Sequence, residues 1–187
     1  MKKFNKSLAM CLSACSIIGT TLGGLPASAH VRNNSMYIEG WIQAGGNWYY
    51  QQANGTRVTG WLRDGGNWYF MNSKGIMRKG WVNVRGKWFH LANNGAMDKG
   101  WLFDGGHWYY LANNGEMKTG WIKVYDKWYY MNPNGTMRTG WLNSNGTLYF
   151  LKPDGSMAVG TFYYNGLPYQ ASVTGQVTGG GNNYTWK

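Results

Sequence analysis

Cysteine and acidic residues are scarce in this sequence, and each scarcity excludes a class of protein. The two cysteines, Cys11 and Cys15, lie near the N-terminus, so no disulfide framework is expected in the rest of the chain. The seven Asp and Glu residues fall in turns and connections at the spacing of a repeat, without the singular pair that general acid–base catalysis needs. No Cys or His cluster has metal-ligand spacing. The sequence therefore predicts a protein that is not an enzyme and that uses no metal and no cofactor.

Long apolar segments are missing after the signal-like N-terminus, so the sequence predicts no transmembrane segment. Residues 1–29 combine a basic start, an apolar run and Ala-Ser-Ala ending at Ala29, which is typical of a secretory signal peptide. Cleavage there would remove three lysines and lower the formal net charge from +11 to +8. We expect a secreted protein. An alternative interpretation of residues 12–15 is a lipoprotein processing site, with a lipid on Cys15.

The remaining positive charge is spread along the chain, because Lys and Arg occur singly and not in one run. One interpretation is a solvated surface, and another is attraction to an anionic partner such as acidic lipid or a phosphate-bearing cell-wall polymer. For an exported repeat protein, we do not expect nucleic acid as the partner.

Aromatic residues and glycine are abundant, and they recur with a fixed period. A Gly-Trp pair recurs at Trp41, Trp61, Trp81, Trp101, Trp121 and Trp141. A second Trp follows at a constant spacing in five units, at Trp48, Trp68, Trp88, Trp108 and Trp128, and Leu148 takes this place in the sixth. Such a period indicates a repeat array. We assign residues 30–40 to a half repeat, 41–160 to six aromatic hairpin repeats, and 161–187 to a degenerate C-terminal capping repeat and tail.

Each unit contains the sequence signal of a β-hairpin. In the second unit, a two-residue loop at Gly65-Gly66 separates two short aromatic runs. This loop pairs Trp61 with Phe70 on one face, which the second Trp shares, and places Leu62 and Tyr69 on the other. Both faces are apolar, which a hairpin alone in water cannot sustain. We therefore expect an all-β fold, a repeat β-solenoid of stacked hairpins with about 20 residues per repeat.

The two apolar faces predict different roles. We interpret the Leu62 and Tyr69 class as packing, and the Trp class as a ligand surface, because Trp is rarely fully buried and Leu would fill the same space. Two indoles closed by a third ring and a methionine favour a soft cation, above all a quaternary ammonium. One such cage binds weakly, whereas several in a row bind a polymer strongly through effective concentration.

The pattern Gly-Trp, Gly-x-Trp-Tyr-Tyr, Gly-x-Met resembles the choline-binding or cell-wall-binding repeats of Gram-positive surface proteins over about residues 33–180. The resemblance implies that choline on teichoic or lipoteichoic acid lies between consecutive units, held by two Trp of one hairpin, a ring of the next and often a Met. It implies up to five sites: Trp41 and Trp48 with Phe70, Trp61 and Trp68 with His90, Trp81 and Trp88 with Tyr110, Trp101 and Trp108 with Tyr130, and Trp121 and Trp128 with Phe150. The expected methionines are Met77, Met97, Met117 and Met137.

The resemblance predicts a non-catalytic module that anchors the protein at the cell wall. Two positions depart from the pattern: a protonated His90 would repel an ammonium, and Leu148 with Gln170 leaves no cage at the sixth junction. Similar aromatic repeats stack on sugars in glucan-binding proteins, so the alternatives are a glucan- or other carbohydrate-binding module and an adhesive surface protein.

Overall fold

The computed structural model describes residues 28–32 and 35–181. The expected signal peptide and Cys15 lie outside these residues, except that Ser28 and Ala29 belong to the first strand. Two compact units make up the chain. Unit 1 is formed by residues up to Val82 together with His90–Met97, and unit 2 by Asn83–Phe89 together with the chain from Asp98 onward.

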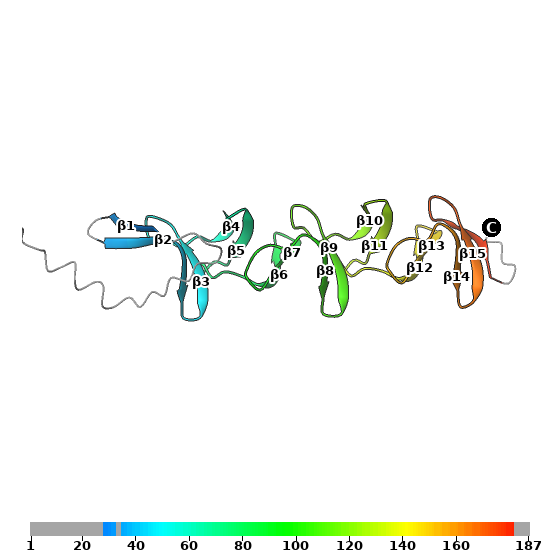
Figure 1. Ribbon diagram of the computed structural model, residues 1–187, viewed down its shortest axis with the longest axis horizontal. Helices are drawn as coiled ribbons and strands as arrows, with labels where there is room; N and C mark the ends of the chain where they lie inside the picture. Colours follow the sequence, from blue (N-terminus) through cyan, green and yellow to red (C-terminus); the bar gives the residue numbers. More distant parts are fainter. Residues whose placement is uncertain (1–27, 33–34, 182–187) are drawn as a thin grey trace, which may run out of the picture. The chain divides into compact units, whose positions relative to one another are not determined.

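The strands are short, and each of them pairs with a neighbour in the sequence (Figure 1). A three-stranded sheet opens the chain and two hairpins follow: β1 (Ser28–Arg32), β2 (Ser35–Ala44) and β3 (Asn47–Gln51), then β4 (Gly60–Asp64) with β5 (Asn67–Met71), and β6 (Gly80–Val84) with β7 (Lys87–Leu91). The next three hairpins are β8 (Gly100–Asp104) with β9 (His107–Leu111), β10 (Gly120–Val124) with β11 (Lys127–Met131), and β12 (Gly140–Ser144) with β13 (Thr147–Leu151). A second three-stranded sheet contains β14 (Gly160–Tyr164), β15 (Leu167–Ala171) and β16 (Val177–Gly180).

This arrangement confirms the expected all-β fold of repeated hairpins, each of about 20 residues as in other short-period arrays. The described residues, 28–32 and 35–181, contain no helix. Accordingly, no helix among them is long and apolar enough to cross a membrane.

The two-residue loops set the register of the hairpins as the sequence predicts. Gly65 and Gly66 have φ angles of 54° and 82°, the left-handed pair that a type I′ turn requires. The strands on either side pair Trp61 with Phe70 and Leu62 with Tyr69. Because paired residues point to one side of a sheet, each hairpin has the expected Trp face and an opposite face. We call the latter the Tyr face, after Tyr69 and its counterparts one repeat apart.

The core lies along the Tyr faces. The last residue of each second strand from β5 to β13 is fully buried, with an exposed fraction of 0–1%: Met71, Leu91, Leu111, Met131 and Leu151. In unit 2, Met131 packs in one cluster with Ile122 and Val124. These aliphatic side chains exclude water beneath the rings and hold each hairpin against its neighbours within a unit.

Backbone hydrogen bonds also tie consecutive hairpins together within each unit. The N–H of Met137, in the connection after β11, donates to the carbonyl of Trp108 in β9 at 2.7 Å. The N–H of Met157 makes the same bond to Trp128, and in unit 1 the N–H of Met77 bonds to Trp48. Each of these methionines is thereby fixed beside the Trp pair of the preceding hairpin.

Candidate ligand-binding pockets

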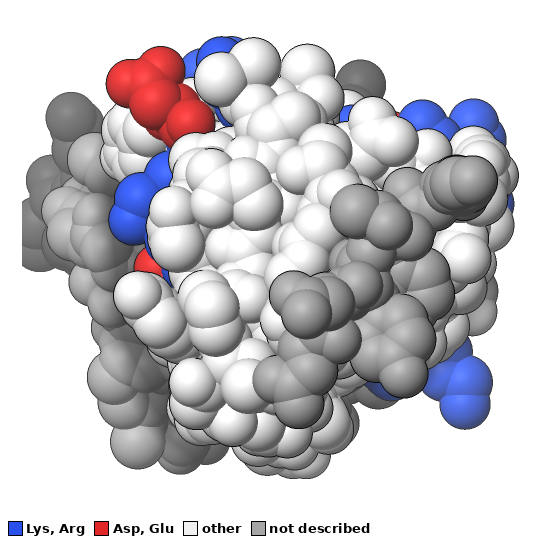
Figure 2. Space-filling model, turned by 90° about the vertical axis from the view of Figure 1, so that its right-hand side faces the viewer, with Lys and Arg blue, Asp and Glu red and all other residues white. Residues whose placement is uncertain are grey.

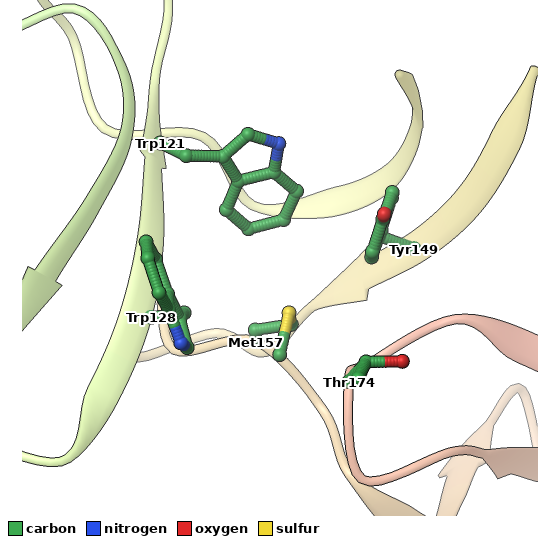
Figure 3. A pocket seen from close by; sticks show the side chains of 5 residues that line it. All are labelled: Trp121, Trp128, Tyr149, Met157 and Thr174. Atoms are coloured by element: carbon green, nitrogen blue, oxygen red, sulfur yellow. The ribbon is translucent and has the colours of Figure 1, made fainter. Parts of the chain in front are cut away.

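Unit 2 contains two aromatic pockets of the same design, one repeat apart. The first, which we call the Trp121 pocket, has a volume of about 260 Å³ and is lined by Trp121, Trp128, Tyr149, Met157 and Thr174 (Figure 3). The two Trp residues come from the hairpin β10–β11, Tyr149 comes from β13, and Met157 and Thr174 come from later connections.

The second pocket, the Trp101 pocket, is larger, with a volume of about 390 Å³. Its walls are Trp101 from β8, Trp108 from β9 and Tyr129 from β11, and the Met137 thioether closes it. Pro153 and Asp154, from the connection after β13, complete the lining.

The rings stand at steep angles to one another and so enclose a volume instead of stacking. Trp101 and Trp108 have centroids 6.3 Å apart and an interplanar angle of 89°, and Trp101 and Tyr129 are 4.8 Å apart at 69°. Trp121 makes nearly the same contacts with Trp128 and Tyr149, at 6.4 Å and 4.8 Å. Trp108 is 44% exposed and Trp128 is 41% exposed. Each pocket is therefore an open, three-walled aromatic corner whose faces are available to a ligand.

The third ring of each pocket comes from the Tyr face of the next hairpin, and it differs from the ring that the family resemblance implied. Tyr129 and Tyr149 line the pockets, while Tyr130 contacts Trp121 of its own hairpin, with 5.3 Å between centroids. The same contact inside one hairpin joins Trp61 to Phe70, Trp81 to His90, Trp101 to Tyr110 and Trp141 to Phe150.

The pleat of the strand explains this difference. A hairpin between two neighbours turns its Trp face to one and its Tyr face to the other, so the surface that meets a Trp face is always a Tyr face. Tyr129 and Tyr149, which we expected to serve packing alone, also line the pockets.

The methionine that lines each pocket lies in the connection after the hairpin that supplies the third ring. Met137 lines the Trp101 pocket and Met157 the Trp121 pocket. Met117 and Met97 make the equivalent backbone bonds, to the carbonyls of Trp88 and Trp68. Met157 occupies the repeated methionine position, although it was not among the residues expected to bind.

Unit 1 contains a more closed version of the same cluster. Trp41 is 8% exposed and lies 4.8 Å from Tyr69, and Met77 packs in the same cluster with Trp48 at its edge. The Trp41 indole N–H donates to an Asp64 carboxylate oxygen at 2.9 Å. Burial first, and then the charge of Asp64, raise the pKa of Tyr69. The ring at this position is therefore a neutral phenol throughout the physiological pH range.

The two remaining expected sites are only partly assembled within single units. Trp61 and Trp68 form a perpendicular pair 6.3 Å apart in unit 1, and His90 of the same unit contacts Trp81. Trp81 belongs to unit 1, whereas Trp88 and Tyr110 belong to unit 2. A site at these residues stays a prediction.

Rings fill the space around Trp141. Phe150, Tyr164 and Tyr169 all lie within 5.7 Å of Trp141, centroid to centroid, and Phe150 stacks on Phe162 at 4.8 Å. Seen from the C-terminal side, the described surface is mostly uncharged, with Lys, Arg, Asp and Glu towards its margins (Figure 2). The last sheet therefore packs onto the sixth hairpin through an aromatic core.

Asp154 is the one carboxylate among the side chains that line these two pockets. It accepts hydrogen bonds from the Ser156 hydroxyl at 2.6 Å and the Ser156 N–H at 3.0 Å. Its second oxygen lies 3.8 Å from the Lys127 ammonium. The Ser156 hydroxyl is the main reason that the pKa of Asp154 is held below its usual range, so the group is ionised at neutral pH.

Gly155 lies directly against the methionine side chain of the Trp101 pocket. Gly155 has a φ of 80°, and a Cβ at this position would collide with the Met137 thioether. Gly166 has a similar φ of 77° but open space around it.

Replacing Gly155 with Ala is expected to lower the free energy of unfolding more than replacing Gly166 with Ala. Both variants incur the cost of a left-handed alanine, about 1–2 kcal/mol, and Gly155→Ala adds a collision that overpacking data put at about 1–3 kcal/mol. Urea denaturation of the two variants measures the difference. Equal losses would show that Met137 moves aside freely.

The sequence of the chain matches known repeat families. Residues 78–120 and 118–162 match a family described as a choline-binding repeat, and residues 39–56 and 59–77 match a putative cell wall binding repeat. The comparison with curated proteins gives no match.

Solved structures from Streptococcus pneumoniae share the fold. CbpJ is 38% identical with a TM-score of 0.73, covering 79% of this chain and 55% of its own. Choline binding protein F is 35% identical with a TM-score of 0.72, covering 87% of this chain and 61% of its own. The modular autolysin LytC is 27% identical with a TM-score of 0.64, covering 78% of this chain and 34% of its own.

This chain thus spans less than two thirds of the length of these proteins. The two repeat models cover most of residues 39–162, and the aromatic pockets lie in that same array. The chain belongs to the family of choline-binding and cell-wall-binding repeat proteins.

Proposed function

We propose that this protein is a non-catalytic, exported module that anchors itself at the cell wall by binding choline on teichoic or lipoteichoic acid. The observation that carries this proposal is the aromatic corner of the Trp101 and Trp121 pockets, where two perpendicular indoles, a phenol ring and a thioether surround one small volume. A trimethylammonium group has no N–H to donate, and its positive charge is attracted by the negative faces of several rings at once.

The residues that hold the ligand in unit 2 are the Trp pair of one hairpin, the Tyr of the next and the methionine that follows. For the Trp101 pocket these are Trp101, Trp108, Tyr129 and Met137. A phenol ring suits this role better than an imidazole ring, which would repel the ammonium when protonated. The assignment thus replaces the ring first expected from the sequence with its neighbour.

Several pockets acting together give the binding affinity that one pocket lacks. A cation–π contact contributes about 0.5–2 kcal/mol depending on desolvation, so a single pocket holds free choline with a dissociation constant on the order of millimolar. A polymer that carries many choline groups binds two or more pockets of one chain, and the second contact forms at high effective concentration. Anchoring to a decorated wall polymer is the function that best uses this arrangement.

The test is to compare free choline, a glucan oligosaccharide and salt as ligands or competitors for the intact protein. Choline in the millimolar range is expected to quench or shift the Trp fluorescence and to elute the protein from a quaternary-ammonium matrix. Raised salt alone should elute much less, because a cation between rings is poorly screened, whereas Lys and Arg contacts to phosphate weaken steeply.

The alternatives predict a different order of ligands. A glucan-binding module would respond to the oligosaccharide by ring stacking and would ignore choline, and an adhesive surface protein would respond to neither. Trp emission that is insensitive to choline and sensitive to glucan would exclude the proposed function.

A further inference from the structure

Unit 2 places its methionines in two kinds of surroundings. Met131 is fully buried, with an exposed fraction of 0%, and belongs to a core cluster. Met137 and Met157 are half-buried and line the Trp101 and Trp121 pockets. Figure 3 shows the sulfur of Met157 pointing into the space that the three rings enclose. A small reagent that enters a pocket therefore reaches the sulfur of Met137 or Met157, whereas the sulfur of Met131 is out of its reach.

A thioether is the side chain in these pockets that a mild oxidant modifies. A hydroperoxide transfers one oxygen atom to the sulfur, which is oxidised by two electrons to the sulfoxide. The O–O bond breaks, an S–O bond forms, and hydrogen peroxide leaves as water, so no further reactant is needed. Cysteine, the other sulfur residue that peroxides oxidise, does not occur in residues 28–32 and 35–181. The sulfur chemistry of this part of the chain is therefore that of methionine.

A glycine behind each pocket sulfur limits where an added oxygen can go. A Cβ placed on Gly155 would collide with the sulfur of Met137, and a Cβ placed on Gly175 would collide with the sulfur of Met157. Each sulfur is therefore packed against a glycine on one side, which leaves the pocket side for the oxygen. Oxidation changes this part of the pocket wall from apolar to polar.

A polar oxygen in the wall opposes the binding of a quaternary ammonium. In an empty pocket the sulfoxide oxygen accepts hydrogen bonds from water, and a ligand that enters expels this water. A trimethylammonium group has no N–H to replace those bonds, so the oxygen is left without a donor. The cation is attracted to the oxygen, but its methyl groups prevent the short contact of a charge-assisted hydrogen bond. Oxidation should therefore weaken binding, and a bound ligand should shield the sulfur.

We propose that Met137 and Met157 are oxidation sites through which peroxide controls ligand binding. The sulfoxide lowers the affinity of its pocket, and an occupied pocket protects its methionine, because the coupling between the two events is reciprocal. This inference rests on the proposed function, since it adds regulation by oxidation to the same two sites. The change is reversible, because methionine sulfoxide reductases restore the thioether.

The first measurement is the rate of sulfoxide formation at each methionine. The full chain is treated with hydrogen peroxide, with and without choline, and peptide mass spectrometry follows each sulfur over time. Without choline, Met137 and Met157 should be oxidised at least about tenfold faster than Met131, whose sulfur is reached only when the core opens locally. Choline at about ten times its dissociation constant should slow the oxidation of Met137 and Met157 by about tenfold, since it depletes the empty pockets by that factor.

The second measurement is the affinity for choline before and after oxidation, followed by NMR on the assigned indole N–H signals of the two Trp pairs. Oxidation should raise the choline dissociation constant of both pockets by about five- to tenfold, the effect of one wall oxygen without a hydrogen bond. A methionine sulfoxide reductase should reverse this change.

Two variants assign the effect to the pocket sulfurs. In a chain with both Met137→Leu and Met157→Leu, peroxide should leave the dissociation constants of the two pockets unchanged, because no sulfur lines them. Met131→Leu is the matched control, since it replaces a methionine of the same unit with an apolar residue of similar volume outside the pockets. Its pockets should respond to peroxide as those of the unchanged chain do.

The outcomes separate the two proposals. If choline moves no indole signal of either Trp pair, the proposed function fails, and this inference fails with it. If choline binds but Met131 is oxidised as fast as Met137 and Met157, regulation by oxidation is overturned and choline binding stands. The same holds if oxidation leaves the dissociation constants unchanged or lowers them, or if the double variant loses affinity on oxidation.

Discussion

Replacing Leu111 with Ala is expected to lower the free energy of unfolding of unit 2 by about 2–5 kcal/mol, the range for deleting a buried leucine side chain. Leu111 has an exposed fraction of 0%, and it ends the strand β9 on the Tyr face. It also forms a β-bridge to Met117, so the cavity would lie where the strand meets the following connection. Each hairpin from β4–β5 to β12–β13 has such a fully buried residue at the end of its second strand.

Urea denaturation followed by far-UV circular dichroism measures this loss. Val173→Ala is the control: Val173 is 94% exposed, so its removal should change the free energy of unfolding by no more than about 0.5 kcal/mol. A loss below about 1 kcal/mol for Leu111→Ala, short of the range for a buried leucine, would mean that the array closes around the cavity and that the rings, not the aliphatic row, hold the hairpins.

Replacing Tyr149 with Leu is expected to weaken choline binding in the Trp121 pocket by about tenfold, while replacing its neighbour Phe150 with Leu should leave that binding nearly unchanged. Tyr149 lines the pocket and contacts Trp121 (Figure 3), so its removal deletes one of three ring faces, a contact of up to about 2 kcal/mol when desolvated. Phe150 is 6% exposed and packs against Trp141 and Phe162. Its loss should instead lower stability.

The measurement is choline titration of both variants by Trp fluorescence, paired with urea denaturation. Trp128→Ala gives the reference for loss of a whole wall, and its 41% exposure predicts a smaller cost in stability than that of Phe150→Leu. Weak binding in Phe150→Leu together with normal binding in Tyr149→Leu would restore the ring assignment that the resemblance alone implied.

The hairpins were predictable because their signals are local. The turn of the second hairpin needs two left-handed residues, and Gly65-Gly66 supplies them. The two-residue period then fixes every cross-strand pair from the turn to Trp61 and Phe70. To predict this register, only the sequence of the two strands of one hairpin and of the turn between them is required.

The ring that lines each pocket from the next hairpin could also be derived from the sequence, although the resemblance implied the residue that follows it. Trp101 and Tyr110 are cross-strand partners and so lie on one face. A ring that faces them from the next hairpin must lie on the opposite face of that hairpin, which selects Tyr129 and not Tyr130. The resemblance carried over the order of the aromatic residues without their sides, and which of the two rings binds a ligand stays a prediction.

The rims of the pockets were not predictable in this way. Asp154 reaches the Trp101 pocket from the connection after β13, more than two repeats along the chain from Trp108. Its place depends on how successive hairpins are rotated against one another, a quantity that accumulates from strand twist and from connection geometry. The period of the sequence identifies equivalent positions in successive repeats, but it does not identify which side chains of different repeats are in contact.

The hydrogen bonds from each methionine back to the previous Trp have a consequence for how the array melts. Each pocket of unit 2 is assembled from consecutive repeats: Trp121 and Trp128 from one, Tyr149 and Met157 from the next, and Thr174 from the one after. A ligand held there binds only when all three are folded, so its binding free energy is added to the coupling between neighbours and not to any single repeat. In a one-dimensional array, stronger coupling makes partial unfolding rarer. Occupied pockets would therefore sharpen the unfolding transition as well as raise its midpoint, so that a ligand-bound chain would resist fraying from its ends.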